Sequence, residues 1–155
     1  MDSDIEVLYN KHDYRYLDLA KFFSTWSKDP STGVGAVAIG ERGQVLAQGY
    51  NGFPRGVTES ETRLENREVK YRYVVHAEMN CIYNAGYNGA KLDGSTLYVH
   101  GLPVCNECAK GIIQVGIERV VSPKNGIESI PDRWKVAILE THSMFDEAGV
   151  IYDFI

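Results

Sequence analysis

Three residues of this sequence have the types and the spacing of a metal site. His76 opens the tripeptide His76-Ala77-Glu78, and Cys105 and Cys108 are separated by two residues. One imidazole and two thiolates supply three ligands to a tetrahedral zinc ion and leave a fourth position for water. We therefore predict one zinc ion per chain, with His76, Cys105 and Cys108 as its ligands.

Glu78 adds a carboxylate beside this predicted centre. It lies two residues from His76, close enough to reach a zinc-bound water without being a ligand itself. Both motifs stand where a helix is expected to begin, and a helix N-terminus favours thiolates electrostatically. Three ligands, an open position and a carboxylate form a hydrolytic metal centre.

Two other interpretations of these motifs stay open. A structural zinc needs a fourth ligand, and the sequence offers four candidates: Cys81, His100, His12 and His142. A redox pair is expected in a thioredoxin-like βαβ setting, whereas this Cys-x-x-Cys pair opens a helix after a late strand. Three cysteines are also an odd number, which argues against a disulfide framework.

Length and charge limit the other functions. The 155 residues suit a single domain spanning residues 1–155, and 21 acidic against 16 basic residues give a net charge of −5. Such a chain lacks the basic surplus that a nucleic-acid backbone requires, although a few local cations suffice for one small phosphate. No apolar run reaches the roughly 18 residues of a membrane span, and the N-terminus is acidic where a signal peptide is basic. We expect a cytoplasmic protein that binds neither membrane nor nucleic acid.

The periodicity of apolar residues predicts alternating helices and strands around these motifs. Residues 59–72 carry charges of both signs and predict a solvated helix or an ordered loop. The remaining expected elements are a helix at 13–26, a hairpin of strands 34–39 and 44–50, a helix at 76–85, a strand at 96–100, a helix from 106 to 115, a strand at 119–122, a helix at 131–145 and a strand at 150–155. This order implies an α/β fold, with a mixed sheet and helices packed on its faces.

Four ordered blocks of the chain resemble the deoxycytidylate (dCMP) deaminases, within the zinc-dependent cytidine and deoxycytidylate deaminase superfamily. That superfamily has the signature H-x-E followed by P-C-x-x-C. The resemblance extends over roughly residues 14–117, and its blocks are residues 28–36, 49–56, 76–80 and 105–110. One departure is that Val104 stands between Pro103 and Cys105, so that the connection from strand to cysteine carries an extra residue.

The resemblance implies a three-layer α/β/α sandwich on a mixed five-stranded sheet. It also implies hydrolytic deamination of dCMP to dUMP with release of ammonia. Glu78 would carry the proton of water to N3 of cytosine and then to the departing amine, and the backbone at Ala77 would hold the edge of the pyrimidine. Asn51 would contact the sugar, while Ser27 and Lys28 would contact the 5′-phosphate.

Members of this family are often hexamers that dCTP activates and dTTP inhibits. The resemblance therefore implies a homo-oligomer, effector binding, and Mg²⁺ accompanying a regulatory nucleoside triphosphate. Three residues are candidates for effector or phosphate contacts: Asp29, Gly52 and Arg55.

Three competing functions remain. The chain could deaminate another cytosine compound, such as a nucleoside, the free base, dCTP or a blasticidin-type molecule. A tRNA adenosine deaminase shares the zinc motifs but needs an RNA-binding surface, which a net charge of −5 disfavours. A zinc-stabilised binding domain without turnover would have no use for Glu78.

Overall fold

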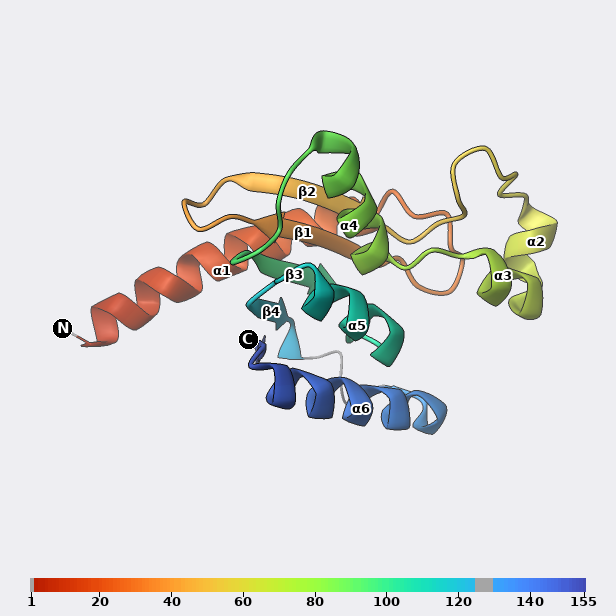
Figure 1. Cartoon of the computed structure of the whole chain (residues 1–155). Helices are drawn as coiled ribbons and strands as arrows, with labels where there is room; N and C mark the ends of the chain where they lie inside the picture. The colour runs from red at the N-terminus through yellow and green to blue at the C-terminus, as the bar shows by residue number, and fades with distance from the viewer. Residues whose placement is uncertain (1, 125–129) are drawn as a thin grey trace.

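The computed structural model describes residues 2–124 and 130–155, with side chains from residue 11 onward. These residues form a five-stranded sheet and six helices (Figure 1). In chain order the elements are α1 (Asp2–Ser24), β1 (Gly35–Ile39), β2 (Val45–Tyr50), α2 (Glu61–Glu65), α3 (Arg67–Tyr73), α4 (Ala77–Asn88), β3 (Thr96–His100), α5 (Asn106–Gln114), β4 (Arg119–Ser122), α6 (Asp132–Ala148) and β5 (Ile151–Phe154).

The sheet is mixed, as the sequence predicts. Its strand order is β2-β1-β3-β4-β5. Strand β1 runs antiparallel to both β2 and β3, whereas β3, β4 and β5 are parallel to one another. The carboxyl ends of the parallel strands therefore share one edge of the sheet, and α5 follows β3 from that edge.

Helices cover both faces of the sheet, which confirms the three-layer α/β/α fold. Successive residues of a strand point to opposite faces. In β1, Ala36 and Ala38 belong to the larger core cluster, under α4, α5 and α6, while Val37 and Ile39 pack with Leu17 of α1 on the other face. Figure 1 shows α1 behind the sheet and α4 and α5 in front of it.

Two glycines let helices approach the sheet closely. A Cβ atom on Gly35 would lie 2.0 Å from the backbone oxygen of Ala20 in α1, so the missing side chain lets α1 pack directly on β1. A Cβ atom on Gly49 of β2 would lie 2.4 Å from the backbone nitrogen of Cys81 in α4. Gly49 thereby sets how closely α4, with His76 at its start, lies on the sheet.

The largest differences from the predicted elements are at residues 59–72 and in the first helix, and the start of the last helix is shifted by one residue. Residues 59–72 form two short helices, α2 and α3, whose N-termini are capped by the side chains of Ser60 and Asn66. Helix α1 begins at Asp2 and ends at Ser24, so it is longer than the helix predicted at 13–26. Pro131 is the N-cap of α6 and not its first helical residue.

Within the described residues, every helix is too short or too polar to cross a bilayer. That residues 1–155 form one domain stays a prediction.

Candidate metal and substrate site

The residues predicted to hold a metal meet at the N-termini of two neighbouring helices. His76 is the N-cap of α4, Cys105 is the N-cap of α5, and Cys108 lies in the first turn of α5. The Nδ1 atom of His76 lies 3.4 Å from the Sγ atom of Cys105 and 3.4 Å from that of Cys108. The three ligand atoms all lie within 4.8 Å of one another. The fold thus brings together two motifs that are 29 residues apart in the sequence.

This geometry fits a tetrahedral zinc ion. Zinc–nitrogen bonds of about 2.0–2.1 Å and zinc–sulfur bonds of about 2.3 Å, at tetrahedral angles, separate the nitrogen from each sulfur by about 3.5 Å. All three cysteines are free, so Cys105 and Cys108 are not a disulfide. Among the described residues no further His, Cys, Asp or Glu atom joins the cluster. The fourth-ligand candidates for a structural zinc all lie outside it: Cys81, His100, His12 and His142.

The cluster also has the electrostatics of a cation site. A hydrogen bond from the Cys108 thiol lowers the pKa of Cys105, since the Cys105 thiolate accepts it, and the same hydrogen bond raises the pKa of Cys108. The hydrogen bond with Cys105 raises the pKa of His76 although burial opposes this. A cation bound here would replace the thiol protons, because metal ligands must be deprotonated.

Glu78 lies beside this cluster, in the first turn of α4. It is only 4% exposed, and burial raises the pKa of its carboxyl group, although the neighbouring His76 lowers it. Ala77 is fully buried at the first position of the same helix, where backbone N–H groups have no partner within the helix. A protonatable carboxyl group and free backbone donors thus lie next to the three metal-ligand atoms.

A cavity of about 240 Å³ opens onto the cluster. His76, Ala77, Glu78 and Cys105 line one part of it. The other lining residues are Asp29, Ser31, Thr32, Val34, Asn51, Arg67, Lys70, Tyr71, Val74, Leu102, Pro103, Ile130, Pro131, Arg133, Trp134, Ala137 and Ile138. Three of them carry positive charge, Arg67 and Lys70 from α3 and Arg133 from α6.

Sequence reasoning missed these three cations. Their only signals were the alternating charges of residues 59–72 and one arginine in the first turn of a late helix, and neither signal points to a ligand.

Lys70 and Asn51 hold the loop between α1 and β1 against this cavity. Lys70 Nζ lies 3.1 Å from Asp29 Oδ1 and 3.3 Å from Ser31 Oγ. The side-chain oxygen of Asn51 accepts a hydrogen bond from the backbone N–H of Val34, and its amide donates to the carbonyl oxygen of Thr32. Asn51 lines the cavity, as the predicted contact with the sugar requires. Its side chain also holds the loop in place through these two hydrogen bonds.

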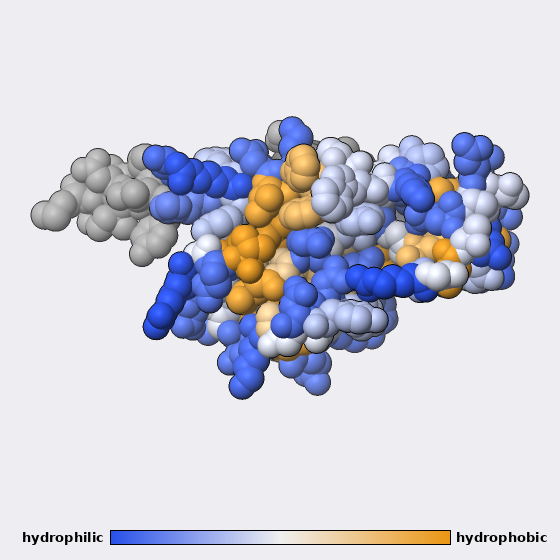
Figure 2. All heavy atoms as spheres, turned by 90° about the horizontal axis from the view of Figure 1, so that it is seen from above, coloured by the Kyte–Doolittle hydropathy of each residue, from blue (hydrophilic) through white to orange (hydrophobic). Residues whose placement is uncertain are grey.

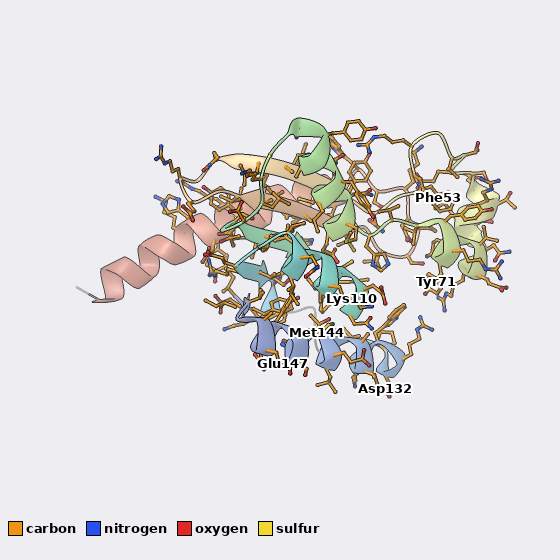
Figure 3. All side chains as sticks on the ribbon, viewed as in Figure 1. Phe53, Tyr71, Lys110, Asp132, Met144 and Glu147 are labelled. Carbon is orange, nitrogen blue, oxygen red and sulfur yellow. The ribbon has the colours of Figure 1, made fainter. Side chains whose placement is uncertain are left out.

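Two aromatic side chains of the cavity wall contact each other edge to face. The rings of Tyr71 in α3 and Trp134 in α6 are 5.9 Å apart and nearly perpendicular. Lys70 Nζ lies 5.7 Å from the centre of the Tyr71 ring, and the Arg133 guanidinium lies 5.7 Å from that of Trp134. Tyr71 lies on the side of α3 that faces the start of α6, where Asp132 is drawn (Figure 3). Helices α3 and α6 thus contribute contacting aromatic rings to the wall of this cavity.

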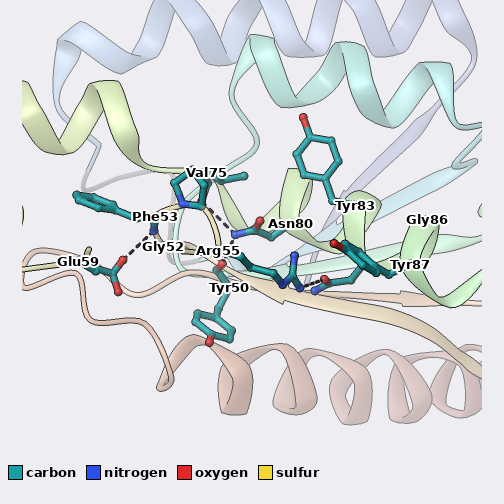
Figure 4. Close-up of a pocket in the computed structure, with 12 residues that line it drawn as sticks. Tyr50, Gly52, Phe53, Arg55, Glu59, Val75, Asn80, Tyr83, Gly86 and Tyr87 are labelled. Atoms are coloured by element: carbon teal, nitrogen blue, oxygen red, sulfur yellow. Dashed lines mark hydrogen bonds between the residues drawn. The ribbon is translucent and has the colours of Figure 1, made fainter. Parts of the chain in front are cut away.

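Four predicted contact residues lie outside this cavity. Ser27 and Lys28 are not among its lining residues, and the Ser27 hydroxyl donates to the carbonyl oxygen of Asn51. Gly52 and Arg55 line a second, more open groove of about 790 Å³ between β2 and α4 (Figure 4). Asp29 does line the cavity, but its carboxylate accepts the hydrogen bond from Lys70.

The second groove presents aromatic rings and one arginine. Arg55 donates a hydrogen bond to the side-chain oxygen of Asn84, and its guanidinium lies 5.1 Å from the centre of the Tyr87 ring. Figure 4 shows Tyr83 and Tyr87 on α4 beside Arg55. The face that carries β2 and α4 also bears a central stripe of apolar residues between polar flanks (Figure 2).

Comparison with known proteins identifies relatives of this chain. Residues 10–123 match the family described as the cytidine and deoxycytidylate deaminase zinc-binding region. A protein of Aliivibrio fischeri, described as an uncharacterized deaminase in the luxG 3′ region, is 40% identical over 136 residues, which are 88% of this chain and 88% of that protein. The deoxycytidylate deaminase of Pongo abelii is 36% identical over 131 residues, covering 81% of this chain and 69% of that protein.

A solved structure has a similar fold. The dCMP deaminase from the cyanophage S-TIM5, in complex with dCMP and dUMP, superimposes with a TM-score of 0.71 at 27% sequence identity. The match covers 92% of this chain and 95% of that chain.

Proposed function

Because the chain belongs to the family of zinc-binding cytidine and deoxycytidylate deaminases, we propose that it converts dCMP and water into dUMP and ammonia. One observation carries this proposal. His76 and Cys105 of the three-residue cluster line one cavity together with the buried Glu78. Relatives named deoxycytidylate deaminase and the similar dCMP deaminase structure support dCMP as the substrate.

His76, Cys105 and Cys108 hold the zinc ion in this proposal. A zinc ion with three protein ligands supplies a water whose pKa is lowered from 15.7 to about 7. Three protein ligands would leave one position of a tetrahedral zinc ion for water, and Glu78 lines the cavity beside these ligands.

Glu78 moves the protons of the reaction. Its carboxylate takes one proton from water and delivers it to N3 of cytosine. It then takes the second proton from the hydroxyl group added at C4 and gives it to the departing amine, so that C4 becomes a carbonyl and ammonia leaves. Burial raises the pKa of Glu78, which suits a group that must hold a proton during the reaction. Ala77 offers its backbone N–H group at the start of α4 to the oxygen at C2 of the base.

The walls of the cavity orient the nucleotide. Tyr71 and Trp134 cover the cavity from α3 and α6 and exclude bulk water from the reacting atoms. Asn51 stays the proposed contact of the sugar, because it lines the cavity.

Two sets of residues compete for the 5′-phosphate. Ser27 and Lys28 are proposed from the resemblance, whereas Arg67 and Arg133 are exposed cations at the cavity itself. We favour the two arginines, since Lys70 is already paired with Asp29 and Lys28 does not line the cavity. A guanidinium group donates two parallel hydrogen bonds to two oxygens of a phosphate. It thereby neutralises the negative charge of the phosphate and fixes its orientation.

Regulation and assembly belong to the same proposal. The groove with Gly52, Arg55 and Tyr87 has an arginine and stacking surfaces for a nucleoside triphosphate such as dCTP or dTTP, with Mg²⁺ as the counterion of its phosphates. Val45 of β2 and Tyr87 of α4 are 54% and 80% exposed, and exposed apolar side chains of this kind favour a homo-oligomer such as the hexamer that the resemblance implies. The cytoplasmic location stays a prediction from the sequence.

A substrate panel tests the proposed function. The zinc-loaded protein is incubated separately with dCMP, CMP, deoxycytidine, cytosine and dCTP, and ammonia release is measured. We expect dCMP to have the highest kcat/KM. If deoxycytidine, cytosine or dCTP has the highest kcat/KM, that compound is the substrate instead of dCMP. If the zinc-loaded protein turns over none of the five compounds, the result favours a binding domain.

A further inference from the structure

The extra residue between Pro103 and Cys105 is held at both of its backbone groups. Val104 is fully buried in the larger core cluster. Its N–H group donates to the Tyr152 hydroxyl at 3.1 Å, and its carbonyl oxygen accepts from the Thr141 hydroxyl at 2.9 Å. Two side-chain hydroxyls thus satisfy the peptide groups on either side of Val104, directly before Cys105.

Both hydroxyls come from rigid surroundings. Thr141 is fully buried in α6, and its Oγ1 atom also lies 3.1 Å from the carbonyl oxygen of Ala137. The Tyr152 ring in β5 stacks on Phe154 at 4.3 Å, and its hydroxyl lies 3.2 Å from Ser122 Oγ. Burial raises the pKa of Tyr152 to about 12, so this hydroxyl keeps its proton at neutral pH.

The two residues lie outside the part of the chain that matches the family. That match ends at residue 123, whereas α6 and β5 span residues 132–154. Helix α6 also contributes Arg133 and Trp134 to the cavity above the metal cluster. The C-terminal segment therefore contacts the site in two ways: Arg133 and Trp134 line the cavity, and other residues of the segment form hydrogen bonds with the backbone of Val104.

We propose that Thr141 and Tyr152 are positioning residues, which fix Cys105 as a metal ligand by holding the backbone of Val104. The proposal rests on the proposed zinc site. An additional residue before Cys105 adds two backbone dihedral angles between the end of β3 and the thiolate, and rotation about them would displace Sγ from His76 Nδ1. The two hydrogen bonds remove that freedom, in the way that outer-shell groups orient metal ligands.

Zinc affinity tests the proposal independently of turnover. We compare the unaltered protein with Tyr152→Phe and Thr141→Val, using competition against a chromogenic chelator, and record the visible absorption of each protein with Co²⁺ in place of zinc. We expect both substitutions to weaken zinc binding about 10–100-fold and to change the Co²⁺ spectrum, since loss of an outer-shell partner has effects of that size.

Three control variants separate positioning from stability. Thr141→Ser keeps the hydroxyl and should restore the affinity. Tyr16→Phe removes a comparable hydrogen bond, from the Tyr16 hydroxyl to the carbonyl oxygen of Gly43 in the hairpin turn, and should leave zinc binding unchanged. Val104→Ala keeps both backbone hydrogen bonds but loses packing, so its Tm should fall while its zinc affinity does not.

The outcomes are distinct. If Tyr152→Phe and Thr141→Val lower the Tm but keep the zinc affinity and Co²⁺ spectrum of the unaltered protein, the positioning role is wrong and the proposed function stands. If Tyr152→Phe does not fold, the comparison of Thr141→Val with Thr141→Ser decides. An unaltered protein that binds no zinc overturns the proposed function and this proposal with it.

Discussion

Lys70 Nζ lies 3.1 Å from Asp29 Oδ1, and the two side chains are only 6% and 13% exposed. The same carboxylate oxygen accepts the backbone N–H groups of Ser31 and Thr32. One ion pair therefore ties α3 to the loop between α1 and β1, and this loop forms part of the cavity wall.

Replacing Lys70 by methionine should destabilise the protein strongly. Asp29 would then remain largely buried without its cation, a change that costs about 3–5 kcal/mol for buried pairs. Urea denaturation measures the loss. Lys135→Met is the control, because it breaks an exposed pair with Asp132 that should contribute about 0–1 kcal/mol. Equal effects of the two substitutions would contradict the importance of the Lys70–Asp29 pair.

Glu78→Gln should separate metal binding from turnover. The amide has nearly the shape of the carboxyl group but cannot carry the protons, so we expect zinc content to stay at one ion per chain while kcat falls about 10²–10⁴-fold. Cys105→Ala should lose zinc and activity together, since it removes a ligand. Elemental analysis and ammonia release measure both quantities, and a near-normal rate for Glu78→Gln would refute its role.

The sequence predicted the fold and the metal cluster because both depend on local signals. The periodicity of apolar residues predicted the bounds of the strands to within a residue or two. The H-x-E and C-x-x-C motifs each place their metal ligands at the N-terminus of one helix. Because the two helices start at the same edge of the sheet, the fold by itself brings His76 and Cys105 together.

The cavity wall could not be predicted in this way. Arg67 and Arg133 are 66 positions apart, counted as 133 − 67, and each lies among other charged residues that face solvent. Only the fold, which places residues of α3 and α6 around one cavity, distinguishes them from such neighbours. The hydrogen bond between Val104 and Tyr152 could not be predicted either, because it joins a loop to a strand that lies 48 residues later in the sequence.

Asp13 should make stability depend on pH below its usual pKa of 3.8. Burial raises the pKa of this carboxyl group, but the hydrogen bonds from Arg119 and Tyr98 lower it by more, so its pKa in the folded protein lies below the usual value. A carboxyl group of this kind stabilises the fold above the unfolded pKa, and the contribution disappears as pH falls through the folded pKa.

Asp13→Asn tests this pH dependence. The difference in unfolding free energy between the unaltered protein and the variant should be constant above about pH 5, where Asp13 is ionised in both states. It should shrink as the pH falls below 3.8. Urea denaturation of both proteins at each pH measures it, and the comparison cancels the titration of all other groups. A difference that grows toward acid pH would contradict the direction of the Asp13 shift.

Arg55→Ala should weaken the response to effectors if the groove between β2 and α4 is regulatory. The test measures the dCMP concentration at half-maximal rate with and without dCTP or dTTP, in the presence of Mg²⁺. We expect each triphosphate to shift this concentration in the unaltered protein, in opposite directions, and to shift it less in the variant. Lys91→Ala, which removes an exposed cation outside the groove, is the control. An unchanged response in Arg55→Ala would exclude this groove as the effector site.

Selectivity for the 5′-phosphate decides between the two proposed sets of contacts. The chain carries a net charge of −5, so a nucleotide monophosphate must be held by local donors and not by the overall field. A site whose polar groups are left unpaired without the phosphate should reject deoxycytidine, and we expect a much higher kcat/KM for dCMP. Each charge-assisted hydrogen bond contributes about 1.5–3 kcal/mol, which is roughly tenfold to 150-fold in kcat/KM.

Arg67→Ala and Arg133→Ala should therefore each lower kcat/KM for dCMP by at least about tenfold and leave that for deoxycytidine nearly unchanged. Lys28→Ala should leave both values nearly unchanged, because Lys28 does not line the cavity. Steady-state kinetics with both substrates measure the effects. If Lys28→Ala narrows the gap between dCMP and deoxycytidine while the arginine variants do not, the phosphate lies at the loop after α1, and the cations of α3 and α6 serve only to close the cavity.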